Sequence, residues 1–171
     1  MSSALAAQPS ASAYARSKEQ AENALLGAGL KQAGVHVTIL RPTNVYGIGM
    51  RGNIRAMLRF IQRGLLPPLP KLDNRLTLVS VADTCHAAYL AATQPHETGQ
   101  TFLLTDGENY TPNLIESAAY VALNREKPRW RTPRMLLFVM SAAAESLDKL
   151  GIWPNDLGLR TYKNLIADRP L

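Results

Sequence analysis

The 171-residue sequence has few of the residues that cross-link small folds or bind metals. Its one cysteine, Cys85, has no partner for an intramolecular disulfide. Its three histidines, His36, His86 and His96, do not stand at metal-ligand spacing from that cysteine. The sequence therefore predicts neither a disulfide scaffold nor a structural metal site.

Long apolar runs are also missing. The longest nearly apolar stretch, 135–144, has ten residues, about half of the ~20 that a membrane-spanning helix needs. The N-terminal residues lack the basic leader and the apolar stretch of a secretory signal. We therefore expect no membrane span and a cytoplasmic location.

Acidic residues are fewer than basic ones, 13 against 19, and the formal net charge is +6. This imbalance favours anionic partners such as phosphates, nucleotides or nucleic acid. With 46% hydrophobic and 19% charged residues, the composition is otherwise that of a globular domain.

Helical and strand-like segments alternate along the chain, which predicts an α/β fold with an at least partly parallel sheet. The segment TNVYG is predicted to be a loop, Asp83 to open a helix, and Thr111 with Pro112 to cap the start of another helix. Helices are predicted at about 12–31, 52–63, 83–93, from 112, and at 133–150, with one short helix in the tail; strands are predicted at 35–40, 76–81 and 101–105.

Tyr14 and Lys18 stand four residues apart in the first predicted helix, so their side chains lie on one face about one turn apart. A neighbouring ammonium favours the phenolate form of a tyrosine. The pair could thus move a proton to or from a sugar hydroxyl while a nicotinamide exchanges the hydride. An exposed helix face with no catalytic role is the alternative for an isolated Tyr-x-x-x-Lys.

Four strings in order extend this motif: YARSKEQAE, LRPTNVYG, RLTLVSVAD and TFLLTDGENYTP. From about residue 2 to 133, they resemble the extended short-chain dehydrogenase/reductases, specifically the NAD-dependent nucleotide-sugar epimerase/dehydratase group. The resemblance implies a partial Rossmann-like, doubly wound sheet with a smaller substrate-binding lobe. It implies one α/β unit over 1–171, with the catalytic helix at about 12–31 and the lobe at about 48–150.

The resemblance also implies catalytic roles. Tyr14 would be the general acid/base, and Lys18 would bind the nicotinamide ribose and polarise Tyr14. Ser3, or Ser2, resembles the serine that hydrogen-bonds the reacting hydroxyl. Ser3 lies only eleven residues before Tyr14, whereas many sugar epimerases have some two dozen, so an ordinary loop serine is the alternative.

Cofactor and substrate residues follow from the same resemblance. Pro42 and Val45 would approach the nicotinamide, largely through backbone groups. Asn44 would face the nucleotide sugar, or else only shape the turn. Arg75 resembles the arginine that binds the substrate diphosphate, although its spacing of eight to Asp83 is one longer than in some family members.

The glycine-rich turn that binds a dinucleotide in this family is absent, since no G-x-x-G-x-x-G occurs in the sequence. We therefore expect the chain to be the C-terminal portion of such an enzyme and to be inactive alone. The cofactor would be NAD or NADP, the substrate a nucleotide sugar, most simply a UDP-sugar. A homodimer through the Tyr14 helix is a further family expectation.

Other functions stay open at this point. A reductase or dehydrogenase of the steroid or flavonoid type shares similar strings, and a non-enzymatic assembly subunit is a second alternative. A nucleic-acid-binding module is a third, although we do not expect one because no recognised nucleic-acid motif accompanies the charges. The basic residues in question are Arg51, Arg55, Arg59 and Arg63, and a cluster of Arg125, Lys127, Arg129, Arg131 and Arg134 around Trp130.

Overall fold

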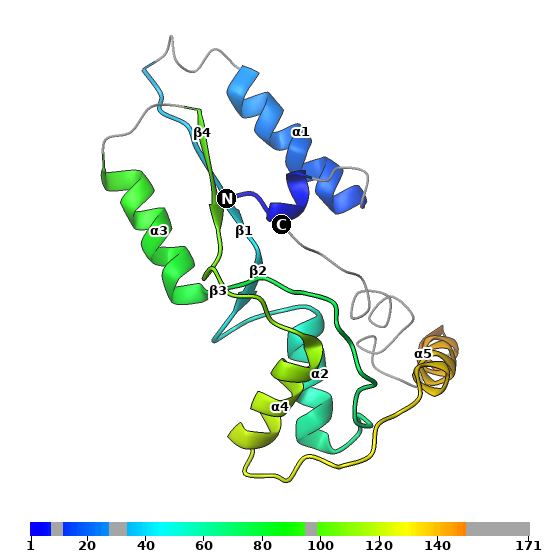
Figure 1. Cartoon of the computed structure of the whole chain (residues 1–171). Helices are drawn as coiled ribbons and strands as arrows, with labels where there is room; N and C mark the ends of the chain where they lie inside the picture. Colours follow the sequence, from blue (N-terminus) through cyan, green and yellow to red (C-terminus); the bar gives the residue numbers. More distant parts are fainter. Residues whose placement is uncertain (8–11, 28–33, 95–98, 150–171) are drawn as a thin grey trace. The chain divides into compact units, whose positions relative to one another are not determined.

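The computed structural model describes residues 1–7, 12–27, 34–94 and 99–149 (Figure 1). The chain forms two compact units. Of the described residues, the first contains those of Met1–Ile48 and Thr77–Glu108, and the second contains Gly49–Leu76 and residues 109–149. The prediction that 1–171 is a single α/β unit stays a prediction.

The first unit contains two pairs of parallel strands. Its strands are β1 (Thr38–Pro42), β2 (Asn44–Tyr46), β3 (Leu78–Ser80) and β4 (Gln100–Leu104), and its helices are α1 (Ala13–Gly27) and α3 (Val81–Thr93). Strand β1 pairs with β4, and β2 pairs with β3. Helices α1 and α3 lie on opposite sides of the β1–β4 pair (Figure 1). The predicted α/β fold with parallel strands is confirmed.

Strand β2 corrects the prediction that TNVYG is a loop. The Thr43 N–H donates to the Leu104 carbonyl at 3.1 Å, and the Asn44 N–H donates to the Thr77 carbonyl at 3.4 Å. The extended chain thus continues past Pro42 because distant strands supply acceptors, which local sequence does not reveal. Strand β1 in turn begins at Thr38 instead of 35, and Val35 is exposed.

The start of α3 also differs from its prediction. The helix begins at Val81, and Ser80, not Asp83, is its N-cap. The Ser80 hydroxyl accepts the Asp83 N–H at 3.0 Å and donates to the Asp83 carboxylate at 2.6 Å. Ser80 therefore satisfies one of the free N–H groups at the start of the helix, and the Asp83 carboxylate holds its hydroxyl in place.

The second unit is helical and contains α2 (Asn53–Arg63), α4 (Pro112–Ala122) and α5 (Arg134–Lys149). Thr111 caps α4 as predicted, since its hydroxyl accepts the Leu114 N–H at 3.2 Å, and Pro112 occupies the first turn. The buried core consists of apolar side chains from all three helices and the loop after α2: Ala56, Met57, Phe60, Ile61, Leu66, Leu69, Ala119 and Leu137.

Some predictions fall on parts of the chain that lie outside the described residues. These are the helix beyond residue 27, the end of the last helix at 150, and the short helix in the tail. No helix in the described ranges is both long and apolar enough to cross a membrane. Among the same residues, no three His, Cys, Asp or Glu side chains are grouped so that they could hold a metal ion.

A charged pair joins α1 to β1. Glu22 on α1 is 5% exposed, and its carboxylate accepts two hydrogen bonds from the Arg41 guanidinium, at 2.9 and 2.5 Å. Hydrogen bonding from Arg41 lowers the pKa of Glu22, and this effect outweighs burial, which acts in the opposite direction. The pair is bidentate and mostly shielded from water, so it fixes both the position and the rotation of the helix against the strand.

We expect Glu22→Gln to lower the free energy of unfolding by about 2 kcal/mol at neutral pH, because it leaves the Arg41 guanidinium without its anion. The pKa of Glu22 is lower in the folded state than its ordinary value of 4.5. Its contribution is therefore present above that value and is lost as the pH falls further. Denaturant titrations at pH 7 and pH 3 should show the gap between wild type and variant closing in acid.

The exposed Glu108 of the same unit provides the matched control. Glu108→Gln should change the unfolding free energy by no more than a few tenths of a kcal/mol. A gap for Glu22→Gln that stays constant between the two pH values would contradict the role of the carboxylate.

Candidate active site

Tyr14 and Lys18 are brought together by α1. Tyr14 is in the first turn of the helix, where its side chain is 52% exposed. The Lys18 ammonium lies over the Tyr14 ring, with Nζ 5.7 Å from the ring centroid. The helix begins at this point because Ser12 caps it, its hydroxyl accepting the Ala15 N–H at 3.1 Å. A phenol and an ammonium thus share one accessible surface, as proton transfer to a bound ligand requires.

Ser3 lies in the same unit, in the segment before a short 3-10 turn, Ala4–Ala7, that packs against α1. Its hydroxyl accepts the Leu5 N–H at 3.3 Å. The neighbouring Ser2 N–H donates to the Leu40 carbonyl at 2.8 Å, which fastens this segment beside β1. The hydroxyl contact of Ser3 is therefore local, and its role toward a ligand stays a prediction.

The residues expected near the nicotinamide occupy the step from β1 to β2. Pro42 is buried at the end of β1, and Val45 is half-buried in β2. Asn44 is exposed, but its side-chain Nδ2 donates to the Thr77 carbonyl at 3.1 Å. The amide of Asn44 thus joins β2 to the segment before β3, and its Oδ1 is the atom left to accept from a ligand.

Arg75 belongs to the second unit and is exposed. It stands one residue before Leu76, which exchanges two backbone hydrogen bonds with Tyr110, each 2.8 Å long. The guanidinium is therefore carried by a segment whose backbone is fixed next to it.

Three glycines, Gly47, Gly49 and Gly52, follow β2 and precede α2, and all have positive φ. Packing explains why position 47 is a glycine. A Cβ on Gly47 would come within 2.8 Å of the Val81 side chain, so close packing of the backbone excludes a larger residue there.

The second cluster of basic residues is largely engaged within the second unit. Arg125 donates to the carbonyls of Ile61 and Gln62, at 3.2 and 3.0 Å, at the C-terminus of α2. Lys127 pairs with Glu116 at 2.5 Å, and Arg134 donates to the Lys71 carbonyl at 2.9 Å. These cations satisfy carbonyls and a buried carboxylate, which reduces the charge that the cluster could offer to a nucleic acid.

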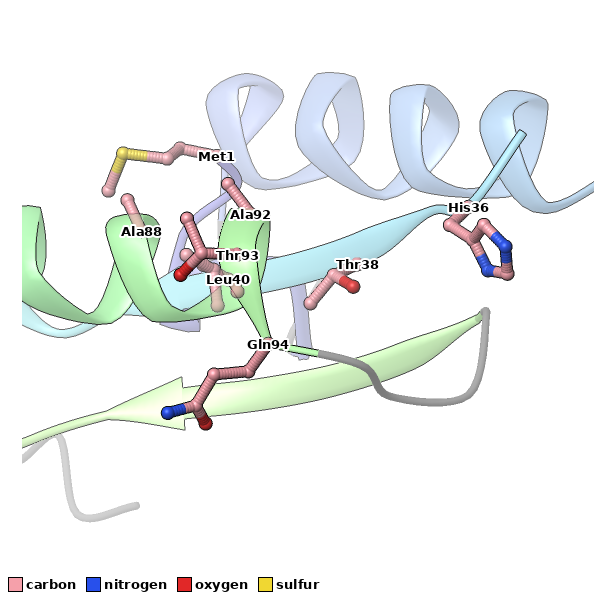
Figure 2. A pocket seen from close by; sticks show the side chains of 9 residues that line it. Met1, His36, Thr38, Leu40, Ala88, Ala92, Thr93 and Gln94 are labelled. Atoms are coloured by element: carbon pink, nitrogen blue, oxygen red, sulfur yellow. The ribbon is translucent and has the colours of Figure 1, made fainter.

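The first unit has a pocket of about 700 Å³ between β1 and α3. Figure 2 shows the side chains that line it. The small side chains of Ala88 and Ala92 on α3 leave space beside Thr38 and Leu40 of β1. Tyr14, Lys18 and Asn44 do not line it. The pocket is therefore separate from the residues that the sequence nominates for catalysis.

Sequence reasoning missed the ion pair between Glu22 and Arg41. Both residues lie inside the strings that carry the resemblance, and Glu22 follows Lys18 by one helical turn. Their ion pair connects the helix of Tyr14 to the strand that ends at Pro42. The sequence did contain a signal for this pair. An acidic residue stands in one motif near Lys18, and a basic residue stands in the next motif beside Pro42.

Comparison with known proteins identifies the family. Residues 2–104 match the NAD dependent epimerase/dehydratase family. The chain is 30% identical over 121 residues to the UDP-glucose 4-epimerase of Vibrio cholerae, a match that covers 70% of this chain and 36% of that protein.

Two solved structures share the fold. A UDP-glucose 4-epimerase from Thermotoga maritima with UDP-glucose has a TM-score of 0.57 at 22% identity, over 70% of this chain and 40% of that one. A dTDP-glucose 4,6-dehydratase from Bacillus anthracis with NAD has a TM-score of 0.57 at 22% identity, over 68% and 38%. The chain thus spans about two fifths or less of the length of these relatives, and it belongs to the NAD dependent epimerase/dehydratase family.

Proposed function

We propose that this chain provides the proton-transfer and substrate-binding part of an NAD-dependent nucleotide-sugar epimerase or dehydratase. The observation that carries the proposal is the Tyr14–Lys18 pair at the accessible start of α1, in a chain that belongs to this family. The resemblance of the chain to both an epimerase and a dehydratase supports the shared first step, oxidation of a sugar hydroxyl.

In that step the Tyr14 side-chain oxygen would accept the proton of the sugar hydroxyl as the adjacent C–H bond breaks and a C=O bond forms. Lys18, whose ammonium lies over the Tyr14 ring, would polarise the phenol and hold the nicotinamide ribose. NAD, when bound, supplies the hydride acceptor. Ser3 would donate a hydrogen bond to the reacting oxygen, a role that its position beside β1 supports.

The cofactor assignment is NAD because the dehydratase relative contains it. The residues of this chain fit the nicotinamide end, where Tyr14 and Lys18 are together and Pro42 and Val45 lie at the end of β1 and in β2. The pyrophosphate needs a glycine-rich turn that the sequence does not contain. We therefore propose that the chain alone is inactive and that catalysis requires a dinucleotide-binding half joined to it. We call this chain together with that half the completed enzyme.

The substrate we propose is a UDP-sugar, since the Thermotoga maritima relative holds UDP-glucose. The Arg75 guanidinium would bind the diphosphate, for which its planar donor fork is suited. Asn44 would accept from the sugar nucleotide through Oδ1, while its Nδ2 remains bonded to the Thr77 carbonyl.

Tyr14→Phe in the completed enzyme should lower kcat by about 10²–10⁴-fold with little change in KM, because it removes the proton-transfer group and spares the ring. Turnover of UDP-glucose measured by product chromatography tests this. Tyr89→Phe, an exposed tyrosine of α3, is the control and should leave kcat unchanged. A Tyr14→Phe variant with near-normal turnover would end the assignment.

Arg75→Ala should raise KM for the nucleotide sugar by about tenfold or more at nearly constant kcat, since a charge-assisted contact to the diphosphate is lost. Initial rates over a range of UDP-glucose concentrations measure this split. Arg129→Ala, an exposed arginine, is the control. An unchanged KM would remove Arg75 from the site.

We also propose that the completed enzyme is a homodimer that associates through α1. Leu25 and Leu26 near the end of this helix are 50% and 47% exposed, and burying them would favour association. Light scattering should give twice the protomer mass, and replacing both leucines by Glu should give one protomer mass. Val121→Glu, at an exposed site on α4, should leave the dimer intact. A wild-type protein of single-protomer mass contradicts the proposal.

A further inference from the structure

The segment that carries Arg75 is anchored on one side by Tyr110, just before α4, and on the other by Asn113, in the first turn of α4. After Arg75, the backbone N–H and C=O of Leu76 pair with those of Tyr110, each at 2.8 Å. Before it, the Leu72 N–H donates to the side-chain Oδ1 of Asn113 at 2.7 Å. Only residues 73–75 lie between the two anchors, so their backbone position is set from both ends.

Asn113 makes a second contact with the same loop, because its Nδ2 donates to the Pro70 carbonyl at 3.0 Å. One turn further along α4, Oε1 of Glu116 accepts the Leu69 N–H at 2.7 Å. The order of the contacts is thus reversed between the two segments. Tyr110 contacts Leu76, Asn113 contacts Leu72 and Pro70, and Glu116 contacts Leu69. We call Asn113 and Glu116 with these contacts the α4 clamp.

The composition of the loop explains why side chains, and not a regular backbone ladder, form its hydrogen bonds to α4. Its sequence LPPLPKL contains three prolines, which have no N–H and cannot form a regular hydrogen-bond ladder. Of the N–H groups that remain, those of Leu69 and Leu72 are both taken by the α4 clamp. Buried backbone N–H groups need hydrogen-bond acceptors. Each hydrogen bond also has a preferred direction, so it fixes the backbone more closely than apolar packing alone would.

The Glu116 carboxylate is 1% exposed, a costly position for a charge. The Lys127 ammonium pairs with it at 2.5 Å and also donates to the Ser117 hydroxyl at 3.1 Å. A buried, paired and hydrogen-bonded carboxylate holds its acceptor in one place. Glu116 therefore fixes the loop at Leu69, the end farther from Arg75 in the sequence. Asn113 fixes it at Leu72, close to Arg75.

We propose that Asn113, supported by Glu116, is a positioning residue that sets the backbone of 73–75 so that the Arg75 guanidinium meets the diphosphate of the nucleotide sugar. This inference rests on the proposed function, in which Arg75 binds that diphosphate. Asn113 acts on substrate affinity through Arg75 and has no part in proton transfer.

A double-mutant cycle in the completed enzyme tests the inference, with KM and kcat for UDP-glucose as readouts. Asn113→Ala should raise KM about tenfold with kcat within about twofold of wild type. In the Arg75→Ala background, Asn113→Ala should add almost nothing to KM, because the residue through which it acts is gone. Leu114→Ala, an exposed neighbour on α4, is the matched control and should leave both constants unchanged.

The outcomes separate this inference from the proposed function. If Arg75→Ala leaves KM unchanged, the proposed diphosphate contact is wrong. If Arg75→Ala raises KM but the fold-changes in KM of the two substitutions multiply in the double variant, Asn113 acts independently of Arg75 and the inference is overturned. A fall in kcat at constant KM also overturns it.

A second variant covers the case in which Asn113→Ala does not fold. Asn113→Asp keeps the acceptor for the Leu72 N–H but places a negative charge against the Pro70 carbonyl. It should raise KM in the wild-type background and not in the Arg75→Ala background. Circular dichroism at the assay temperature establishes which variants are folded, and an unchanged KM in a folded variant contradicts the inference.

Discussion

The bidentate pair between Glu22 and Arg41 is the interaction on which the nominated catalytic residues depend. Glu22 belongs to the helix that carries Tyr14 and Lys18, and Arg41 immediately precedes Pro42 at the end of β1. A bidentate contact between a planar guanidinium and a carboxylate is directional, so the pair constrains the rotation of the helix as well as its distance. Proton and hydride transfer both need alignment within a fraction of an ångström, which this kind of contact can supply.

A second buried charge organises the other unit in a similar way. The buried Glu116 carboxylate accepts a hydrogen bond from the Leu69 N–H and pairs with the Lys127 ammonium. In each unit, a carboxylate on a helix thus fixes a neighbouring segment that leads to a residue nominated for binding. Two of the basic residues that look like a surface for nucleic acid in the sequence, Arg125 and Lys127, serve this internal role, because a helix C-terminus and a buried carboxylate attract them.

Local signals in the sequence predicted much of the fold. The helix at 52–63 and the Thr111 cap with Pro112 follow from short-range patterns, and the structure confirms them. Strand β2 was missed because its partners, Thr77 and the β3 strand, lie more than thirty residues away. Glu22 with Arg41 and Asn113 with Leu72 were missed for the same reason, since their separations of 19 and 41 residues leave no periodic trace. Tyr14 and Lys18 were found because one helical turn brings them together.

The central claim is that this chain completes a site in which a sugar hydroxyl is oxidised by NAD. Its most direct test is a rapid-mixing experiment in which UDP-glucose is added to the NAD-loaded completed enzyme and the absorbance of reduced nicotinamide is followed. The account predicts a transient of reduced nicotinamide that decays as product forms. Binding of UDP-glucose, shown by calorimetry, with neither reduced nicotinamide nor product would contradict it.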